Sequence, residues 1–362
     1  MKISVIPATE LDAALIEKWK VIQTGNSALQ SPYYCPEFTQ SVSQCGRDVK
    51  IAVMESAGGV SGFFPYEHDR RCQLQPVGGG LNVYHGAITA LGLDWSPLLL
   101  LKASGRRYFA FNHMPMSQAV FLPHIRFPHV SPVMELQGGW KQYGQRLAIA
   151  QNKSTPGIFA AVRYSTKRIE REVGPLRFEI RERNPAVLEA VMRLKAEQRV
   201  RMGSDGEDPF TQPWIRELLS NFFDRQDVSF RGSLCALYAG DKLVACHFGL
   251  QALGTLHYWF PVYETAYATY QPGLIMLMRL AEQGSQEGLD LIDLGRGMQD
   301  YKTRFCTKSV ALGEGAVSWP PALASAVMAA QKIKGQIKSN PQVQRLRAWV
   351  AQRGMRAAPA TQ

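Results

Sequence analysis

The sequence of 362 residues lacks any long apolar run. Its longest apolar stretch, WSPLLLL at residues 95–101, is far shorter than the roughly 18 residues that a membrane-spanning helix requires. The first 20 residues carry acidic side chains and have no apolar core of the kind found in a secretory signal. We therefore expect a cytoplasmic protein.

Cysteine is also scarce, and the cysteines form no motif. The chain has six of them, and no two form a C-x-x-C pair or a Cys/His spacing typical of metal sites. The sequence therefore suggests neither a zinc site nor a disulfide framework. We expect no bound metal, and reduced, mostly buried thiols at Cys35, Cys45, Cys72, Cys235, Cys246 and Cys306.

Acidic side chains are absent after Glu314, whereas seven Lys and Arg residues lie between Lys332 and Arg356. This tail carries most of the formal net charge of +11. A second basic zone, residues 141–183, holds ten Lys and Arg against four Glu. Such charge suits an anionic partner, namely nucleic acid, an acidic membrane surface or a phosphorylated cofactor, although a solvated helix face is the simpler explanation.

The residues that are present indicate a packed α/β protein of two domains. The length exceeds what one core comfortably holds, and the composition, 46% apolar and 20% charged, is ordinary for a globular protein. Short apolar runs separated by Gly, Pro and Asn predict strands in the first half. We place an N-terminal domain at 1–140, a basic helical connector at 141–174, a C-terminal domain at 175–320 and a basic helical tail at 321–362.

Individual elements can be assigned from local patterns. In the first half, helices are predicted near residues 10–21 and 36–45. In the second half, residues 175–182 alternate as a strand. Helical spacing and cap residues then predict two helices, and three strand-like runs joined by tight turns follow, so that the elements lie at 184–202, 211–224 and 232–263.

An apolar helix starts at Pro272, directly after the strand that ends at Tyr263. The next strand, residues 291–295, should lie beside that strand. The first turn of a helix leaves backbone N–H groups unpaired, so residues 273–275 should form an anion site. Gly273 would let a phosphate approach the backbone closely.

Several short motifs follow one another along the sequence. The second half contains an aromatic–acidic pair, a Pro-Gly helix start, an Asp-x-Gly-x-Gly turn and a Tyr-Lys-x-x-Phe sequence, met by Tyr263-Glu264, Gln271-Pro272-Gly273, residues 293–297 and residues 301–305. In the first half SPYYCPEF, GFFPYE and PVGGGLNVYHG appear in order. With these motifs, most of residues 20–310 resembles the GNAT-type acyltransferases of cellulose and exopolysaccharide biosynthesis (CelD/BcsL-like). The resemblance implies two tandem GNAT-like domains, each a mixed, mostly antiparallel sheet flanked by helices, with acetyl-CoA or another acyl-CoA as donor.

Three positions depart from that family pattern. Glu264 stands where the family has aspartate, and Gln271 stands where it has the serine before Pro-Gly. Asn82 replaces the aspartate of another motif, in which Tyr84 and His85 are retained. The phosphate loop is reduced to a single Pro-Gly, so contacts at the helix start should differ from those of the family.

The family in turn resembles the Fem-type aminoacyl transferases of cell-wall synthesis. There a lysine in a Tyr/Phe-Lys-x-x-Phe context lies at the active centre, which implies a catalytic role for Lys302. A fixed cation near the reacting carbonyl can stabilise the oxyanion of acyl transfer. Tyr301 and Phe305 would anchor the backbone of Lys302, and Tyr301 is grouped with it as a catalytic candidate. The alternative interpretation of Lys302 is a surface lysine in a polar loop.

Three histidines lie in candidate regions. His85, in a Gly-rich turn of the first domain, is a candidate general base for the acceptor, and its alternative is a hydrogen-bonded loop histidine. His247 and His257 alternate with apolar residues in strand-like runs. We interpret these two as core histidines.

The remaining candidates should contact substrate or donor. Arg296, between two glycines, suits a phosphate or a substrate carboxylate. Asp293 needs a partner such as Arg296 or Lys302, so a structural ion pair is as good an interpretation as a functional one. Tyr84 and Glu264 complete the expected substrate contacts, and the expected donor contacts are Gln271, Pro272, Gly273 and Leu274.

Together these features predict an acyl-CoA-dependent N- or O-acyltransferase that acts on a sugar, sugar nucleotide or exopolysaccharide by direct transfer. One alternative is long-chain acyl transfer to a lipid amine, with the basic tail as a peripheral contact to the inner membrane. A Fem-like aminoacyl-tRNA-dependent transferase is another, although we do not expect nucleic acid binding, because the sequence offers no aromatic platform for single strands. The last is a non-catalytic scaffold in a polysaccharide synthase complex. The acceptor, the acyl chain length and the oligomeric state are left open.

Overall fold

The computed structural model describes residues 1–69, 73–154, 157–204, 206–225, 227–324 and 327. The predicted basic tail, 321–362, therefore lies almost entirely outside the described residues.

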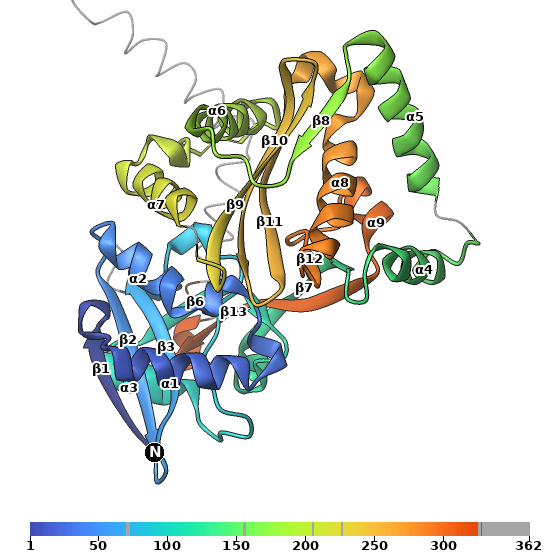
Figure 1. Ribbon diagram of the computed structural model, residues 1–362. Coiled ribbons are helices and arrows are strands. Elements are labelled where there is room, and N and C mark those ends of the chain that lie inside the picture. The colour runs from blue at the N-terminus through green and yellow to red at the C-terminus, as the bar shows by residue number, and fades with distance from the viewer. Residues whose placement is uncertain (70–72, 155–156, 205, 226, 325–326, 328–362) are drawn as a thin grey trace, which may run out of the picture.

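In the described residues, thirteen strands form one continuous sheet, in the order β1-β2-β3-β4-β6-β13-β7-β12-β11-β10-β9-β8, with β5 paired to β3 (Figure 1). The strands are β1 (Lys2–Pro7), β2 (Val49–Ser56), β3 (Gly59–His68), β4 (Leu74–Gln75), β5 (Ile88–Thr89), β6 (Tyr108–Pro115), β7 (Ile125–Glu135), β8 (Leu176–Glu179), β9 (Phe230–Ala239), β10 (Lys242–Ala252), β11 (Thr255–Tyr263), β12 (Leu291–Asp293) and β13 (Lys308–Ser318). The α-helices are α1 (Ala13–Thr24), α2 (Pro36–Gln44), α3 (Pro97–Ser104), α4 (Trp140–Ala150), α5 (Gly157–Glu172), α6 (Pro185–Arg201), α7 (Pro213–Asp224), α8 (Pro272–Gln286) and α9 (Asp300–Phe305).

The two halves of the sheet have the same arrangement. In the N-terminal half, β1 to β4 are followed by β6, which is parallel to β4, and β13 closes the half. In the C-terminal half, β8 to β11 are followed by β12, which is parallel to β11, and β7 closes the half. The predicted fold class, two tandem units of mixed and mostly antiparallel sheet flanked by helices, is confirmed.

The closing strands are exchanged between the halves. β7 comes from the first part of the chain and pairs with β12, whereas β13 comes from the last part and pairs with β6. The two exchanged strands also pair with each other, which joins the halves into one sheet. The division at 1–140 and 175–320 stays a prediction, and each half of the sheet includes one strand from across that division. The helices α4 and α5 occupy the predicted connector.

Helices cover both faces of the C-terminal half (Figure 1). On one face α6 and α7 pack in an apolar core that they share with α1 and α2 of the other half. On the opposite face α4, α5 and α8 pack in a second core. The start of α6 follows the predicted pattern, because the Asn184 side chain accepts a hydrogen bond from the Ala186 N–H and Pro185 is the first helical residue.

The strands β11 and β12 part near the middle of the C-terminal half. They pair from Thr255↔Leu291 to His257↔Asp293, and β11 then continues to Tyr263 while β12 ends. The neighbouring strand β10 approaches very closely at Gly249, where an added Cβ would lie 2.2 Å from the His257 carbonyl oxygen. In the N-terminal half the corresponding region beside β4 and β6 is filled by aromatic side chains, which leave only about 10 Å³, and these include Tyr34, Phe64 and Phe109.

Candidate active site

A cleft of about 670 Å³ lies where β11 and β12 part. Its walls come from β11, from the segment between β12 and α9, from the start of α8 and from one side of α6. The N-terminal half contributes Val83 and His113. Eight of the eleven residues proposed above from the sequence line this cleft: Gln271, Pro272, Gly273, Leu274, Asp293, Arg296, Tyr301 and Lys302.

The start of α8 lies at one end of the cleft, beside Tyr263. Gln271 precedes it in the left-handed conformation, with φ of 53°. The N–H groups of Leu274 and Ile275 both donate to the Gln271 carbonyl, at 3.0 and 3.3 Å. Two of the three N–H donors predicted at this helix start are therefore engaged within the helix, which leaves Gly273 and the helix dipole to attract an anion.

Lys302 lies at the point where the strands part, and it is only 5% exposed. Its ammonium donates to the carbonyl oxygens of Gly295, at 2.7 Å, and Arg296, at 3.1 Å. An ammonium has three N–H donors, so one remains for a ligand in the cleft. Burial lowers the pKa of Lys302 to about 8, and the nearby carboxylate of Asp293 opposes that shift.

Asp293 is buried and receives three hydrogen bonds. The hydroxyls of Tyr84 and Ser131 each donate to its carboxylate at 2.5 Å, and the Gly295 N–H donates at 2.8 Å. Two predicted substrate contacts, Asp293 and Tyr84, are thus bound to each other. Their bond links the N-terminal half to the turn that holds Lys302.

Arg296 is also engaged across the two halves. Its guanidinium donates to the Asn112 carbonyl and to the Glu314 carboxylate, both at 2.9 Å, and contacts the His129 ring. The side chain lines the cleft and is held by the N-terminal half of the sheet.

Three of the predicted residues do not line the cleft: Tyr84, which holds Asp293, and also His85 and Glu264. His85 is 3% exposed, its Nε2 lies 3.1 Å from the Asn82 carbonyl oxygen, and burial lowers its pKa to about 3. Glu264 forms an ion pair with Arg193 at 2.5 Å. Tyr301 does line the cleft, and burial raises its pKa to about 12, so its hydroxyl is protonated at neutral pH.

The cleft also contains residues that the sequence analysis did not select. His257 is buried as predicted, yet it lines the wall, with its Nε2 3.0 Å from the Ser31 hydroxyl. Lys195 of α6 faces the cleft from the other side. Lys195 falls three and four residues after Met192 and Val191, two buried positions of α6. This spacing places a lysine on the apolar face of the helix, and that unusual position could have indicated a functional residue.

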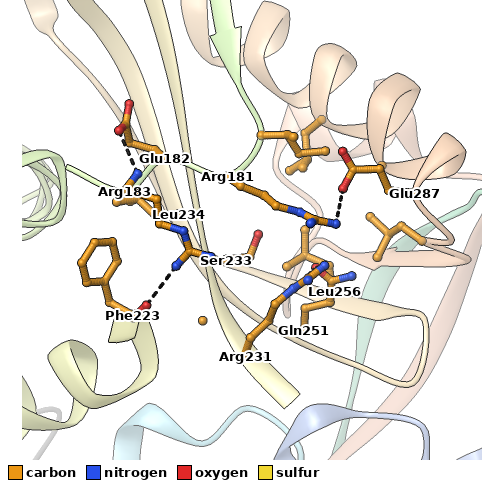
Figure 2. Close-up of a pocket in the computed structure, with 15 residues that line it drawn as sticks. Arg181, Glu182, Arg183, Phe223, Arg231, Ser233, Leu234, Gln251, Leu256 and Glu287 are labelled. Atoms are coloured by element: carbon orange, nitrogen blue, oxygen red, sulfur yellow. Dashed lines mark hydrogen bonds and ion pairs between the residues drawn. The ribbon is translucent and has the colours of Figure 1, made fainter. Parts of the chain in front are cut away.

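A second hollow, of about 20 Å³, lies beside the C-terminal end of α8 (Figure 2). Figure 2 shows Arg181 paired with Glu287, at 2.6 Å, and Arg183 donating to the Phe223 carbonyl, at 3.3 Å. This volume is close to that of a single water molecule, so the larger cleft is the candidate active site.

Among the described residues no group of three His, Cys, Asp or Glu side chains is placed to hold a metal ion. The cysteines that the structure describes are free, and Cys72 is outside that set. In the part of the chain that is described, no helix combines the length and the apolar character needed to cross a membrane.

Comparisons with known proteins agree with this fold. Residues 159–303 match the model of the acetyltransferase (GNAT) domain. The structure of FemX is similar, with a TM-score of 0.55 and 10% identity over 87% of this chain and 96% of that chain. The C-terminal domain of a putative lysylphosphatidylglycerol synthetase from Agrobacterium fabrum gives a TM-score of 0.53 and 13% identity over 88% of this chain and 96% of that chain. No curated protein matches the sequence.

The two structural likenesses show the fold, because their identities are low. The GNAT domain match runs from Phe159 in α5 to Thr303 in α9, and it includes all the cleft residues except Val83 and His113. The domain match supports an acyltransferase, and a GNAT domain implies an acyl-CoA donor in general.

Proposed function

We propose that the protein transfers an acyl group directly from acyl-CoA to an amine or hydroxyl of a sugar, sugar nucleotide or exopolysaccharide. The observation that carries this proposal is the ammonium of Lys302 at the parting of β11 and β12, in the same cleft as the start of α8. The motifs of exopolysaccharide acyltransferases in this sequence support the choice of acceptor.

The residues of the cleft fit an acyl-CoA. The helix dipole and the Gly273 N–H offer a place for a phosphate, and nothing crowds Gly273, because an added Cβ would meet only Tyr263 at 3.7 Å. The donor supplies an activated thioester carbonyl, and the acceptor nitrogen or oxygen forms the new bond to its carbon as the carbon–sulfur bond breaks.

Lys302 and Tyr301 would have separate tasks in that reaction. The third N–H of Lys302 can donate to the carbonyl oxygen as negative charge develops on it. The protonated hydroxyl of Tyr301 can donate its proton to the leaving sulfur and then regain a proton from water. The proton that the acceptor loses passes to water, since His85 lies away from the cleft.

A second candidate function is transfer of a long acyl chain to a lipid amine. Apolar side chains on the cleft wall favour it, since they could cover such a chain, and they include Met202, Trp259, Val262 and Leu274. The likeness to the lysylphosphatidylglycerol synthetase domain concerns the fold and does not identify the acceptor of this protein.

Calorimetric titration with acetyl-CoA and then with a long-chain acyl-CoA tests the proposal. Binding should be lost in Gly273→Glu, which places a carboxylate where the phosphate would lie, and retained in the matched control Gly273→Ala. Tighter binding of acetyl-CoA supports the sugar acceptor, and tighter binding of the long-chain form supports the lipid acceptor. If neither binds, the acyl-CoA proposal is wrong, and a tRNA-dependent transferase or a scaffold takes its place.

A further inference from the structure

Lys195 is a cation for which the proposed reaction has no task so far. Its ammonium donates to the Gln198 side-chain oxygen at 2.9 Å, and Gln198 also lines the cleft. No described carboxylate forms an ion pair with Lys195. Two of its three N–H donors are therefore available to a ligand.

The cleft around Lys195 has an excess of positive charge. Lys302 and Lys195 both face it, and the Asp293 carboxylate already receives three hydrogen bonds. The guanidinium of Arg296 is paired with Glu314. Burial and the neighbouring Arg199 lower the pKa of Lys195 to about 8. Both disfavour the charged form of Lys195 when no anion is bound beside it. A bound anion would remove that penalty.

Lys195 reaches the cleft from the face of the sheet opposite the donor helix. The helix α6 packs in the core of one face and α8 in the core of the other face (Figure 1). The cleft lies between them, at the parting of β11 and β12. If the donor phosphate lies at the start of α8, then a molecule at Lys195 approaches the reacting carbonyl from the α6 face, which is where the acceptor must enter.

We propose that Lys195 binds an anionic group, a carboxylate or a phosphate, on the acyl acceptor. This inference rests on the proposed function, because it takes the start of α8 as the donor site. It narrows the acceptor to an acidic molecule, such as a phosphorylated or carboxylated sugar, and gives Lys195 the task of holding that acid group while the nucleophile faces Lys302.

The test measures the thermal unfolding temperature of the full chain, saturated with CoA, against increasing inorganic phosphate in a low-chloride buffer. Saturation with CoA fills the donor site, so a further rise in unfolding temperature reports a second anion site. Phosphate also stabilises proteins in a general way, so the comparison is between variants at equal phosphate. Acetate titrated in the same manner tests the carboxylate.

Three variants make the assignment specific. Lys195→Met should lower the apparent affinity for phosphate, read from the phosphate dependence of the unfolding temperature, roughly 10- to 100-fold, as expected for the loss of a hydrogen bond to a charged group. Lys195→Arg should retain it. Arg199→Met removes the same charge from the same helix, at a residue that does not line the cleft, and should also retain it. Unchanged CoA affinity in Lys195→Met would show that this variant is folded.

The possible results separate this inference from the proposed function. Phosphate binding that persists with CoA present and depends on Lys195 supports the acceptor site. Binding that CoA abolishes assigns the anion to the donor and overturns the inference, and so does an equal effect in Lys195→Met. If CoA itself does not bind, the proposed function fails first.

Discussion

Replacing Lys302 by methionine removes the ammonium from the parting of β11 and β12 while keeping a side chain of similar length. Two of its N–H groups are bound to the Gly295 and Arg296 carbonyls, so one donor is lost to the substrate. Loss of one preorganised donor to an oxyanion typically lowers kcat by about 10²–10³-fold, or about 2.7–4 kcal/mol. The KM for acyl-CoA should not change, because the proposed contact with the donor phosphate is made by the start of α8 and not by Lys302.

The same substitution has a structural cost that the assay must separate from the chemical one. The carbonyl groups of Gly295 and Arg296 lose their donor, which costs about 1–3 kcal/mol where such a group stays buried. Activity is therefore measured as release of the CoA thiol with an acceptor found by screening, beside a thermal unfolding curve. The matched control is Lys308→Met, an exposed lysine at the start of β13. Added ethylamine should partly restore kcat in Lys302→Ala by supplying an ammonium to the vacated space.

A folded Lys302→Met enzyme that keeps more than about a tenth of the wild-type kcat would refute the oxyanion role of Lys302, since one lost oxyanion donor costs more than that. An equal loss in Lys308→Met would also refute it, because that lysine does not line the cleft.

Two further predictions concern charge and packing. The wild-type kcat should fall as pH rises through about 8, because the pKa of Lys302 is lowered from 10.5 to that value and the ammonium is lost above it. A fall only near pH 10.5 would contradict the role of Lys302. The control variant Lys195→Arg should show the same fall in kcat near pH 8. Gly249→Ala should lower the free energy of unfolding, measured with urea, by about 1–3 kcal/mol or more, because the added carbon would lie 2.2 Å from the His257 carbonyl oxygen, whereas Gly58→Ala, which meets nothing within 4 Å, should have no such effect.

The elements that depend on local sequence could be predicted. The helix α6 has an N-cap residue, Asn184, and a proline at its first position. The apolar patterns of α8 and of the strands β9 to β11 indicate where these elements begin and end. The exchange of β7 and β13 could not be predicted, because an alternating pattern predicts a strand but does not identify the strand with which it pairs.

The same difference holds for the candidate site. Gly273, Arg296 and Lys302 lie in one continuous stretch whose motifs drew attention to them. Lys195 and His257 lie in an ordinary helix and an ordinary strand, and only the folded chain brings them to the cleft. Conversely, Tyr84 belongs to a motif, yet its hydroxyl is used to hold Asp293.

The N-terminal half completes the cleft of the C-terminal half instead of forming an open cleft of its own. Its aromatic residues fill the region beside β4 and β6, while its polar side chains reach across. Asp293 depends on Tyr84 and on Ser131 of β7, and His257 depends on Ser31. Tyr84, Ser131 and Ser31 all lie outside residues 159–303, the segment that matches the GNAT domain. A buried carboxylate that loses its hydrogen bonds is strongly destabilised, so residues 159–303 alone would not hold the turn that carries Lys302 in place. The pairing of β7 with β13 and the apolar core that α1, α2, α6 and α7 share keep the two halves together.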